Sequence, residues 1–293
     1  MPRGWKAGRL GPFELGGLWK LDSPHSYFGG WSALLLMPSG QFLALSDRNM
    51  RLRFSPPGVV VKDIPQKTPV GIRKAIYLKR KDGGLEAFDI ESAVLAPDKS
   101  IWFGLENDDR LIRVDEDRTK GAFVRLAALR DWPENGGAEA MTRLADGRWM
   151  ILCETCGVRR DGLHLGLLFA DYPDRSQPQK FGLVLPVGHD PVDMATLPDG
   201  RLLILTRRLV FFPLHFESTL VLADPAKLDL ARPWATQELA RIDDAAVREN
   251  YEGMALRPTG AGLEVWLISD ANGSALQETR LMKLCLDLKR LPG

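Results

Sequence analysis

One pattern recurs five times along the chain and constrains its fold more than any other feature. An apolar run that opens on a polar residue leads into a short Pro/Gly/Asp turn, and a second apolar run then ends in a polar residue. Each copy is typical of two strands joined by a tight turn, because β-branched and aromatic residues alternate up to turn-forming residues. The copies begin at Trp31, Ile90, Ala138, Val192 and Asn250. The chain is therefore an array of one repeated unit.

The spacing within the units predicts where their polar ends lie. In four units the first and last polar residues are 15 positions apart, and these pairs are Ser32–Asp47, Glu91–Glu106, Glu139–Glu154 and Asp193–Arg208. In the fifth unit Glu252 and Asp270 are 18 positions apart because the turn is longer. The first residue of one antiparallel strand and the last of its partner lie at the same end. Five units in one orientation, as radial repeats require, would bring five polar pairs to one edge.

The step between units predicts an all-β propeller. Unit starts near 32, 91, 139, 193 and 252 leave 48 to 59 residues per unit, enough for four strands and their loops. Five four-stranded blades therefore form a single domain over residues 1–293. A sixth blade, built from residues 49–88, is the alternative that this spacing leaves open.

The two ends of the chain predict how the ring closes. The last unit is one outer strand short, and residues 13–22 alternate like a strand, so the N-terminal strand is expected to complete the last blade. In the first unit, residues 52–55 and 59–64 are expected to form the outer strands. Residues 68–88 are interpreted as an extra segment.

Composition excludes several classes of function. The 39 basic and 38 acidic residues balance, and no basic cluster is interleaved with aromatic residues, so no nucleic-acid partner is expected. No apolar run approaches the roughly 20 residues of a membrane span. The N-terminus lacks the apolar stretch of a signal peptide. Cys153 and Cys156 form a C-x-x-C, but no second ligand pair accompanies them, so a zinc or redox site is not expected. Together with Cys285, they are interpreted as small apolar residues plus one exposed thiol.

The propeller interpretation gathers acidic residues at one mouth of the central tunnel. The first strands would carry Glu91, Glu139, Asp193 and Glu252, and Asp47, Glu106, Glu154 and Asp270 would lie just outside them. Carboxylates in such a ring repel one another unless cations compensate them. Calcium prefers 6–8 oxygen ligands, and the neighbouring amides that could add oxygens are Asn107, Asn135, Asn250 and Asn272. The alternative is that the acids cap strand ends or pair with Arg48, Arg207 and Arg208.

The unit boundaries resemble those of a known family. The residues that carry the resemblance are Trp31-Ser-Ala with Ser-Asp-Arg48, Asp89-Ile-Glu-Ser-Ala with Gly-Leu-Glu-Asn107, Asn135-Gly-Gly-Ala-Glu-Ala-Met, Asp193-Met-Ala-Thr with Thr-Arg-Arg208, and Asn250-Tyr-Glu-Gly-Met-Ala with Ile-Ser-Asp-Ala-Asn272 and Gln277. Together they resemble the "esterase-like activity of phytase" family of bacterial phytase-like β-propeller proteins, over about residues 30–286. Thr206, Ala271 and Gly273 depart from the family pattern.

The resemblance implies a hydrolase that acts on a small-molecule phosphoester, ester or lactone at the acidic mouth, assisted by a divalent cation, most simply calcium. It also implies a periplasmic or secreted location. The residues expected to act in catalysis are Glu139, Glu91, Glu252 and Arg208. Those expected to hold the metal are Glu91, Glu139, Glu252, Asp47, Glu106, Glu154, Asp270 and Asn272, and those expected to bind substrate are Arg48, Arg207, Arg208 and Asn107. The alternative is a non-catalytic propeller that binds a ligand, glycan or protein.

Overall fold

The computed structural model describes residues 9–59, 71–76, 88–106, 109–115, 121–133, 135–158, 161–271 and 277–293, and its strands form five sheets. Blade 1 consists of β3 (Trp31–Leu36), β4 (Phe42–Ser46), β5 (Met50–Phe54) and β6 (Gly71–Lys74). Blade 2 consists of β7 (Ile90–Leu95), β8 (Ile101–Leu105), β9 (Arg110–Val114) and β10 (Gly121–Arg125). Blade 3 consists of β11 (Ala138–Arg143), β12 (Trp149–Val158), β13 (Leu163–Phe169) and β14 (Pro178–Val184), with the short parallel strand β18 (Trp234–Ala235) at its edge.

The last two blades complete the ring. Blade 4 consists of β15 (Asp190–Thr196), β16 (Leu202–Phe211), β17 (Leu214–Ala223) and β19 (Gln237–Ile242). Blade 5 consists of β20 (Tyr251–Thr259), β21 (Gly262–Ser269) and β22 (Arg280–Leu286), followed outward by β2 (Phe13–Lys20) and β1 (Arg9–Leu10). Short 3-10 turns lie at Ala127–Leu129, Pro225–Lys227 and Leu288–Arg290. Within the described ranges, no helix is long and apolar enough to cross a membrane.

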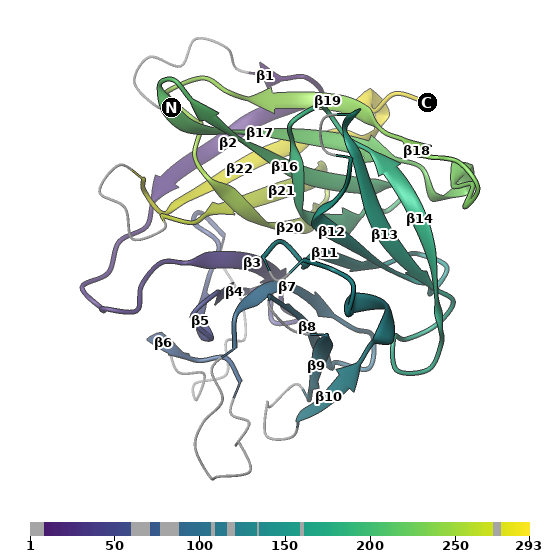
Figure 1. Ribbon diagram of the computed structural model, residues 1–293. Coiled ribbons are helices and arrows are strands. Elements are labelled where there is room, and N and C mark those ends of the chain that lie inside the picture. The colour runs from purple at the N-terminus through teal and green to yellow at the C-terminus, as the bar shows by residue number, and fades with distance from the viewer. Residues whose placement is uncertain are drawn as a thin grey trace.

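The innermost strands meet around one centre. Contacts run from β20 to β3, from β3 to β7, from β7 to β11, from β11 to β15 and from β15 back to β20. Figure 1 shows β3, β7, β11 and β20 at the middle of the molecule, with β10 and β14 at its periphery. The protein is thus a five-bladed β-propeller. Because β3 and β7 are direct neighbours, the alternative of a sixth blade from residues 49–88 is wrong.

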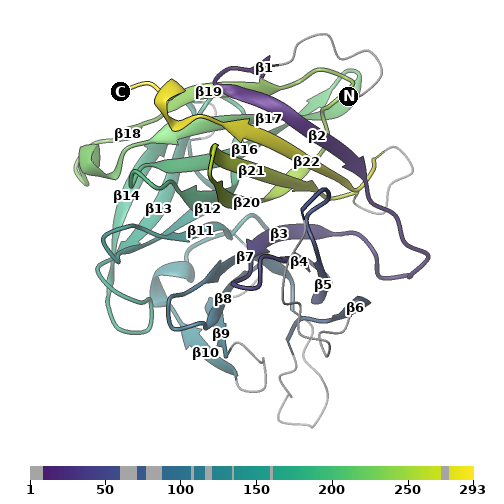
Figure 2. The same ribbon diagram turned by 180° about the vertical axis from the view of Figure 1, so that it is seen from behind.

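The N-terminal strand closes the ring as the sequence predicts. β2 pairs with β22 from Phe13 opposite Leu286 to Lys20 opposite Arg280. Figure 2 shows β2 lying along β22 at the edge of blade 5. In blade 1 the strand that pairs outside β5 is β6, inside the segment interpreted as extra, and the outer strand expected over residues 59–64 lies almost wholly outside the described residues. Of those residues, Val59 lies outside any strand and 60–64 lie outside the described residues, as do 68–70 and 77–87 of the extra segment.

The continuous apolar runs of the middle strands arise because each blade is covered on both faces. On β4, Phe42 and Ala44 pack toward Trp266 of blade 5, whereas Leu43 and Leu45 pack toward Phe103 of blade 2. The same alternation continues around the ring, so that one apolar cluster fills each of the five gaps between blades. A sheet buried on both faces needs apolar residues at successive positions rather than at every second one.

Polar ties also hold neighbouring blades together at the centre. The Ser92 hydroxyl donates to the Ala138 carbonyl across blades 2 and 3, at 2.6 Å, and the Ser32 hydroxyl donates to the Ile90 carbonyl across blades 1 and 2. Blade 5 approaches blade 1 so closely that a Cβ on Gly253 would lie 2.8 Å from the backbone carbon of Ala33. These contacts fix the innermost strands as a rigid frame for the tunnel mouth.

Candidate functional site

A bulge at the same position in all five blades positions the mouth residues. The register between the first and second strands shifts once per blade, for example between Ile90 and Ser92 in blade 2. The bulged residues are Ser32, Glu91, Glu139, Val192 and Glu252. The residues that follow the matching point on the second strands are Asp47, Glu106, Glu154, Arg207 and Asp270. A β-bulge turns side chains away from the regular pleat.

Blade 4 differs from the sequence-based register by one residue. Its bulge is at Val192, not Asp193, and Arg207 rather than Arg208 takes the place that carboxylates occupy on the other second strands. The mouth therefore carries seven of the predicted acids around one guanidinium. We call this set the acidic ring, namely Glu91, Glu139, Glu252, Asp47, Glu106, Glu154 and Asp270 with Arg207.

Arg207 compensates the negative charge on one side of the acidic ring. Its guanidinium donates to the Glu154 carboxylate at 3.0 Å, to the Asn250 amide oxygen at 3.1 Å and to the Glu252 carboxylate. The Asn250 amide also donates to Glu252 at 2.7 Å. Burial opposes the charge on Arg207, but Glu154 and Glu139 outweigh it and raise its pKa. This side of the ring carries its own fixed cation.

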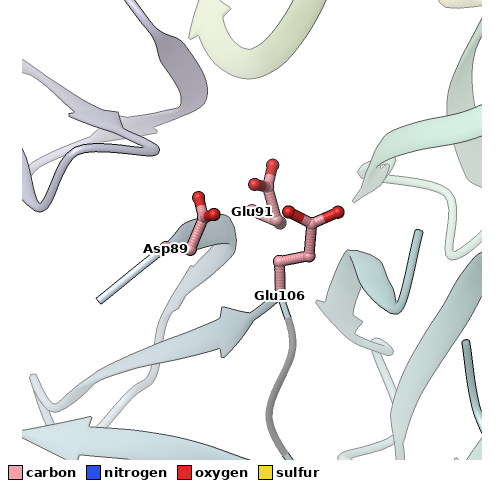
Figure 3. Close-up of side chains that lie close together, drawn as sticks. All are labelled: Asp89, Glu91 and Glu106. Carbon is pink, nitrogen blue, oxygen red and sulfur yellow. The ribbon is translucent and has the colours of Figure 1, made fainter. Parts of the chain in front are cut away.

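The opposite side holds acids without such a partner. Carboxylate oxygens of Asp89, Glu91 and Glu106 lie within 4.8 Å of one another, and Figure 3 shows the three carboxylates gathered at one point. The Gly136 N–H donates to Glu106 at 3.1 Å. Among the described residues, no Lys, Arg or His forms an ion pair with any of the three. We call these residues the acid triad.

Burial and mutual repulsion raise the pKa values of three acids on this side of the ring. Burial raises the pKa of Glu91 well above its usual range, and the neighbouring Glu139 and Asp89 raise it further. Burial also raises the pKa of Glu139, with Glu154 as the second cause, and that of Glu106. Clustered carboxylates share protons unless a cation replaces them. The acid triad is thus a place where a bound cation and protons would compete.

Asp47 and Asp270 form the segment of the acidic ring between blades 1 and 5. Asp270 accepts the Gly30 N–H at 2.7 Å. Gly30 has φ +67°, and a Cβ there would overlap the Asp47 carboxylate, so glycine is required at this position. Burial raises the pKa of Asp47 to about 6, with the negative charge of Asp270 as the next cause, although Arg48 opposes it.

Several residues predicted for the site lie elsewhere. Asp193 is fully buried and accepts the Met194 N–H at 2.7 Å and the Met254 N–H at 2.6 Å, so it ties blade 4 to blade 5 instead of entering the mouth. Arg208 pairs with Glu217 on β17, because successive side chains of β16 point to opposite faces. Arg48 lies 3.8 Å from Asp47, at the margin of the ring. Asn107 and Asn272 lie outside the described residues.

Asp89 is the member of the site that sequence reasoning did not assign. It stands two positions before Glu91, in the Asp-Ile-Glu of the second unit. Residues two apart in a strand share a face, and this signal could have identified it.

The C-x-x-C segment beside the ring differs from the sequence-based interpretation. Cys153 and Cys156 are joined in a disulfide, which spans a four-residue irregularity in the pairing of β12 with β13. Glu154 lies inside this loop, so the disulfide braces the backbone that presents Glu154 to Arg207. Cys285 is half-buried and free.

The fold and the site together define a five-bladed propeller with an acidic ring at one mouth. A family model described as phytase-like, "esterase-like activity of phytase", matches residues 26–273. The chain therefore belongs to this family, as the resemblance of its unit boundaries predicts.

Comparison with solved structures shows the fold alone. The endo-arabinase from Bacteroides thetaiotaomicron is similar with a TM-score of 0.55 at 12% identity, over 90% of this chain and 96% of that one. A thermostable family-43 glycoside hydrolase is similar with a TM-score of 0.54 at 10% identity, over 89% of this chain and 90% of that one. No curated protein matches the sequence significantly.

Proposed function

We propose that the protein is a hydrolase that cleaves a phosphoester, ester or lactone at the acidic ring with the help of a divalent cation. The observation that carries the proposal is the acid triad, whose three carboxylates converge with no ion pair to a basic side chain in the described part of the chain. The family's description as esterase-like supports the reaction class.

The donor set fits a hard cation. Asp89, Glu91 and Glu106 offer only carboxylate oxygens, and their spacing of at most 4.8 Å suits ligands that share one ion. Calcium binds such oxygens at about 2.3–2.6 Å, so two ligands of the same ion lie up to about 5 Å apart. When bound, the cation would polarise a substrate oxygen and lower the pKa of a bound water.

The protein's own residues would supply positioning and proton transfer. Glu139 lies next to the triad, and burial and Glu154 raise the pKa of its carboxyl, which favours a role as the acid that protonates a leaving oxygen. Arg207 pairs with Glu154 and Glu252 and holds both side chains in place. Arg48, at the margin of the ring and 43% exposed, remains the predicted contact for an anionic substrate group.

A second candidate is a propeller that binds a ligand at its mouth without turning it over. The pairing of Arg207 with Glu154 and Glu252 favours it, because these acids are already neutralised and are not free to hold a metal ion. The two candidates share a binding site and differ in turnover.

The test combines thermal melting with hydrolysis assays. The protein is melted with EDTA and then with calcium, magnesium, manganese or zinc, and an ion at 100 times its dissociation constant should stabilise the fold by about 2.7 kcal/mol. Glu91→Gln should abolish this response, whereas Glu238→Gln, which removes an exposed acid paired with Arg241 outside the ring, should not. Turnover of 4-nitrophenyl phosphate, 4-nitrophenyl acetate and δ-valerolactone is then measured with the stabilising ion.

The outcomes separate the candidates. Stabilisation and turnover that are both lost in Glu91→Gln support the metal-assisted hydrolase. Stabilisation without turnover of any ester class favours the binding propeller. A melting temperature that no ion changes refutes the cation at the acid triad.

A further inference from the structure

A cavity lies beside the acidic ring, between blades 4 and 5. It has a volume of about 520 Å³, in the range of small-molecule sites. Its walls come from the β16–β17 hairpin, from the loop before β20 and from the start of β22, and include Leu209, Leu214, Phe216, Arg248, Glu249 and Arg280. We call this cavity the hairpin pocket.

The apolar wall exists because the β16–β17 hairpin extends past the mouth. The second strands of blades 1 and 5 end at Ser46 and Ser269, next to the ring, whereas β16 continues four residues beyond Arg207 and still pairs with β17 at Phe211 opposite Leu214. The overhang is apolar and exposed: Phe211 is 67%, Phe212 94% and Leu214 62% accessible. A ligand against this wall would remove apolar surface from water.

The opposite wall is polar and held in place. The loop before β20 is fixed by Asp244, whose carboxylate accepts the Ala246 N–H at 2.8 Å, and by the Tyr251 hydroxyl, which donates to the Val247 carbonyl at 2.8 Å. Arg248 projects from this loop and donates to the Asp243 carbonyl at 3.3 Å.

The two arginines of the pocket differ in their ion pairing with carboxylates. Among the described residues, no carboxylate forms an ion pair with Arg248. Arg280, by contrast, pairs with Glu249 at 3.6 Å and Glu278 at 3.0 Å. The positive charge that the pocket offers to a ligand is therefore that of Arg248.

The hairpin pocket also borders the site already described. The Phe216 ring lines the pocket and lies 5.7 Å from the Arg207 guanidinium, which binds Glu154 and Glu252 of the acidic ring. A ligand in the pocket thus sits one side chain away from the ring.

We propose that the hairpin pocket binds a small amphipathic anion, a carboxylate with an acyl chain, with the chain against Leu209, Leu214 and Phe216 and the carboxylate on Arg248. An apolar wall opposite a guanidinium that no carboxylate of the described residues pairs with selects this class over a sugar or a cation. The inference extends beyond the proposed function, because binding in the pocket does not require the ring to be catalytic.

Titration calorimetry of the full chain with sodium octanoate in EDTA tests the proposal without a metal ion. Arg248→Gln should weaken octanoate binding about tenfold or more, the effect of losing a charge-assisted hydrogen bond. Leu214→Ser should weaken it as well. From butyrate to octanoate, affinity should rise about two- to fourfold per methylene.

Matched controls lie outside the pocket. Arg241→Gln removes an exposed arginine on β19 of blade 4, and Val187→Ser removes another exposed apolar side chain, 64% accessible. Neither should change octanoate binding. Melting temperatures should stay close to that of the wild type in all four variants, because none of these side chains belongs to the buried core.

A lipid bilayer also presents acyl chains beside anionic groups, so it is the competing ligand. Sedimentation with phosphatidylglycerol vesicles tests whether the protein binds it. Octanoate binding that depends on Arg248 and on chain length supports the proposal. Absence of octanoate binding, an Arg248→Gln variant with wild-type affinity, or binding to vesicles without binding to octanoate overturns it. Failure of the metal test leaves this result unaffected, so the two ideas can fail separately.

Discussion

Replacing Arg207 with Gln removes the guanidinium that pairs with Glu154 and Glu252 in the acidic ring and leaves both carboxylates without this cation. The three side chains are 21%, 13% and 12% exposed, so water screens the pair only partly. Removing one partner of a buried ion pair costs about 3–5 kcal/mol, and the partial exposure favours the lower end, about 3 kcal/mol. An unfolding entropy of about 2.1 cal/mol/K per residue gives about 0.6 kcal/mol/K for 293 residues, and hence a fall in melting temperature of about 5 °C.

The loss of folding stability in Arg207→Gln should depend on pH in a defined direction. Burial and Glu154 raise the pKa of Glu139, and Arg207 opposes that rise, so removing the guanidinium should raise the pKa of Glu139 further above that of an unfolded glutamate. A carboxyl with a raised folded-state pKa loses stability as pH rises, so the deficit should be largest near pH 8 and shrink toward pH 5. Scanning calorimetry in EDTA at several pH values measures it.

Arg208→Gln is the matched control for Arg207→Gln. Arg208 is the next residue on β16 but is 41% exposed and pairs with Glu217 outside the ring. Loss of an exposed pair costs at most about 1 kcal/mol, or less than about 2 °C here. An Arg207→Gln variant that melts like the wild type at pH 8, or with a deficit independent of pH, would refute the view that Arg207 neutralises the ring.

Two further predictions concern single carboxylates. The raised pKa of Asp47, about 6 against an ordinary 3.8, means that its ionisation in the folded state removes stability as pH rises across this interval. In EDTA, Asp47→Asn should therefore flatten the fall in melting temperature between about pH 4 and pH 6, and a parallel curve for variant and wild type would contradict this. Asp193→Asn keeps one acceptor but sets an amide donor against a backbone N–H, so calorimetry should show a loss of about 1–3 kcal/mol. The same variant should keep the response to added cations. Loss of that response would show that Asp193 belongs to the site.

Local patterns in the sequence predict much of the architecture. The repeated hairpin units predict the number of blades, and the missing strand of the last unit predicts that residues 13–22 close the ring. These features depend on short-range alternation and turn chemistry, which a sequence displays directly. Most acids of the ring were likewise predictable, because a constant spacing within a hairpin places them at one end.

Tertiary structure decided which charges meet. A bulge at Val192 rather than Asp193 moves blade 4 by one residue, and a one-residue shift sends every side chain of a strand to the opposite face. For this reason Arg207 enters the acidic ring, Arg208 turns to Glu217, and Asp193 becomes a tie to Met254. The acid triad and the hairpin pocket depend in the same way on distances between residues far apart in the chain. The repeat pattern alone predicts a five-bladed propeller with an acidic mouth. The hydrogen bonding between strands and blades, which no local pattern encodes, pairs Arg207 with Glu154 and Glu252 and leaves Asp89, Glu91 and Glu106 clustered together.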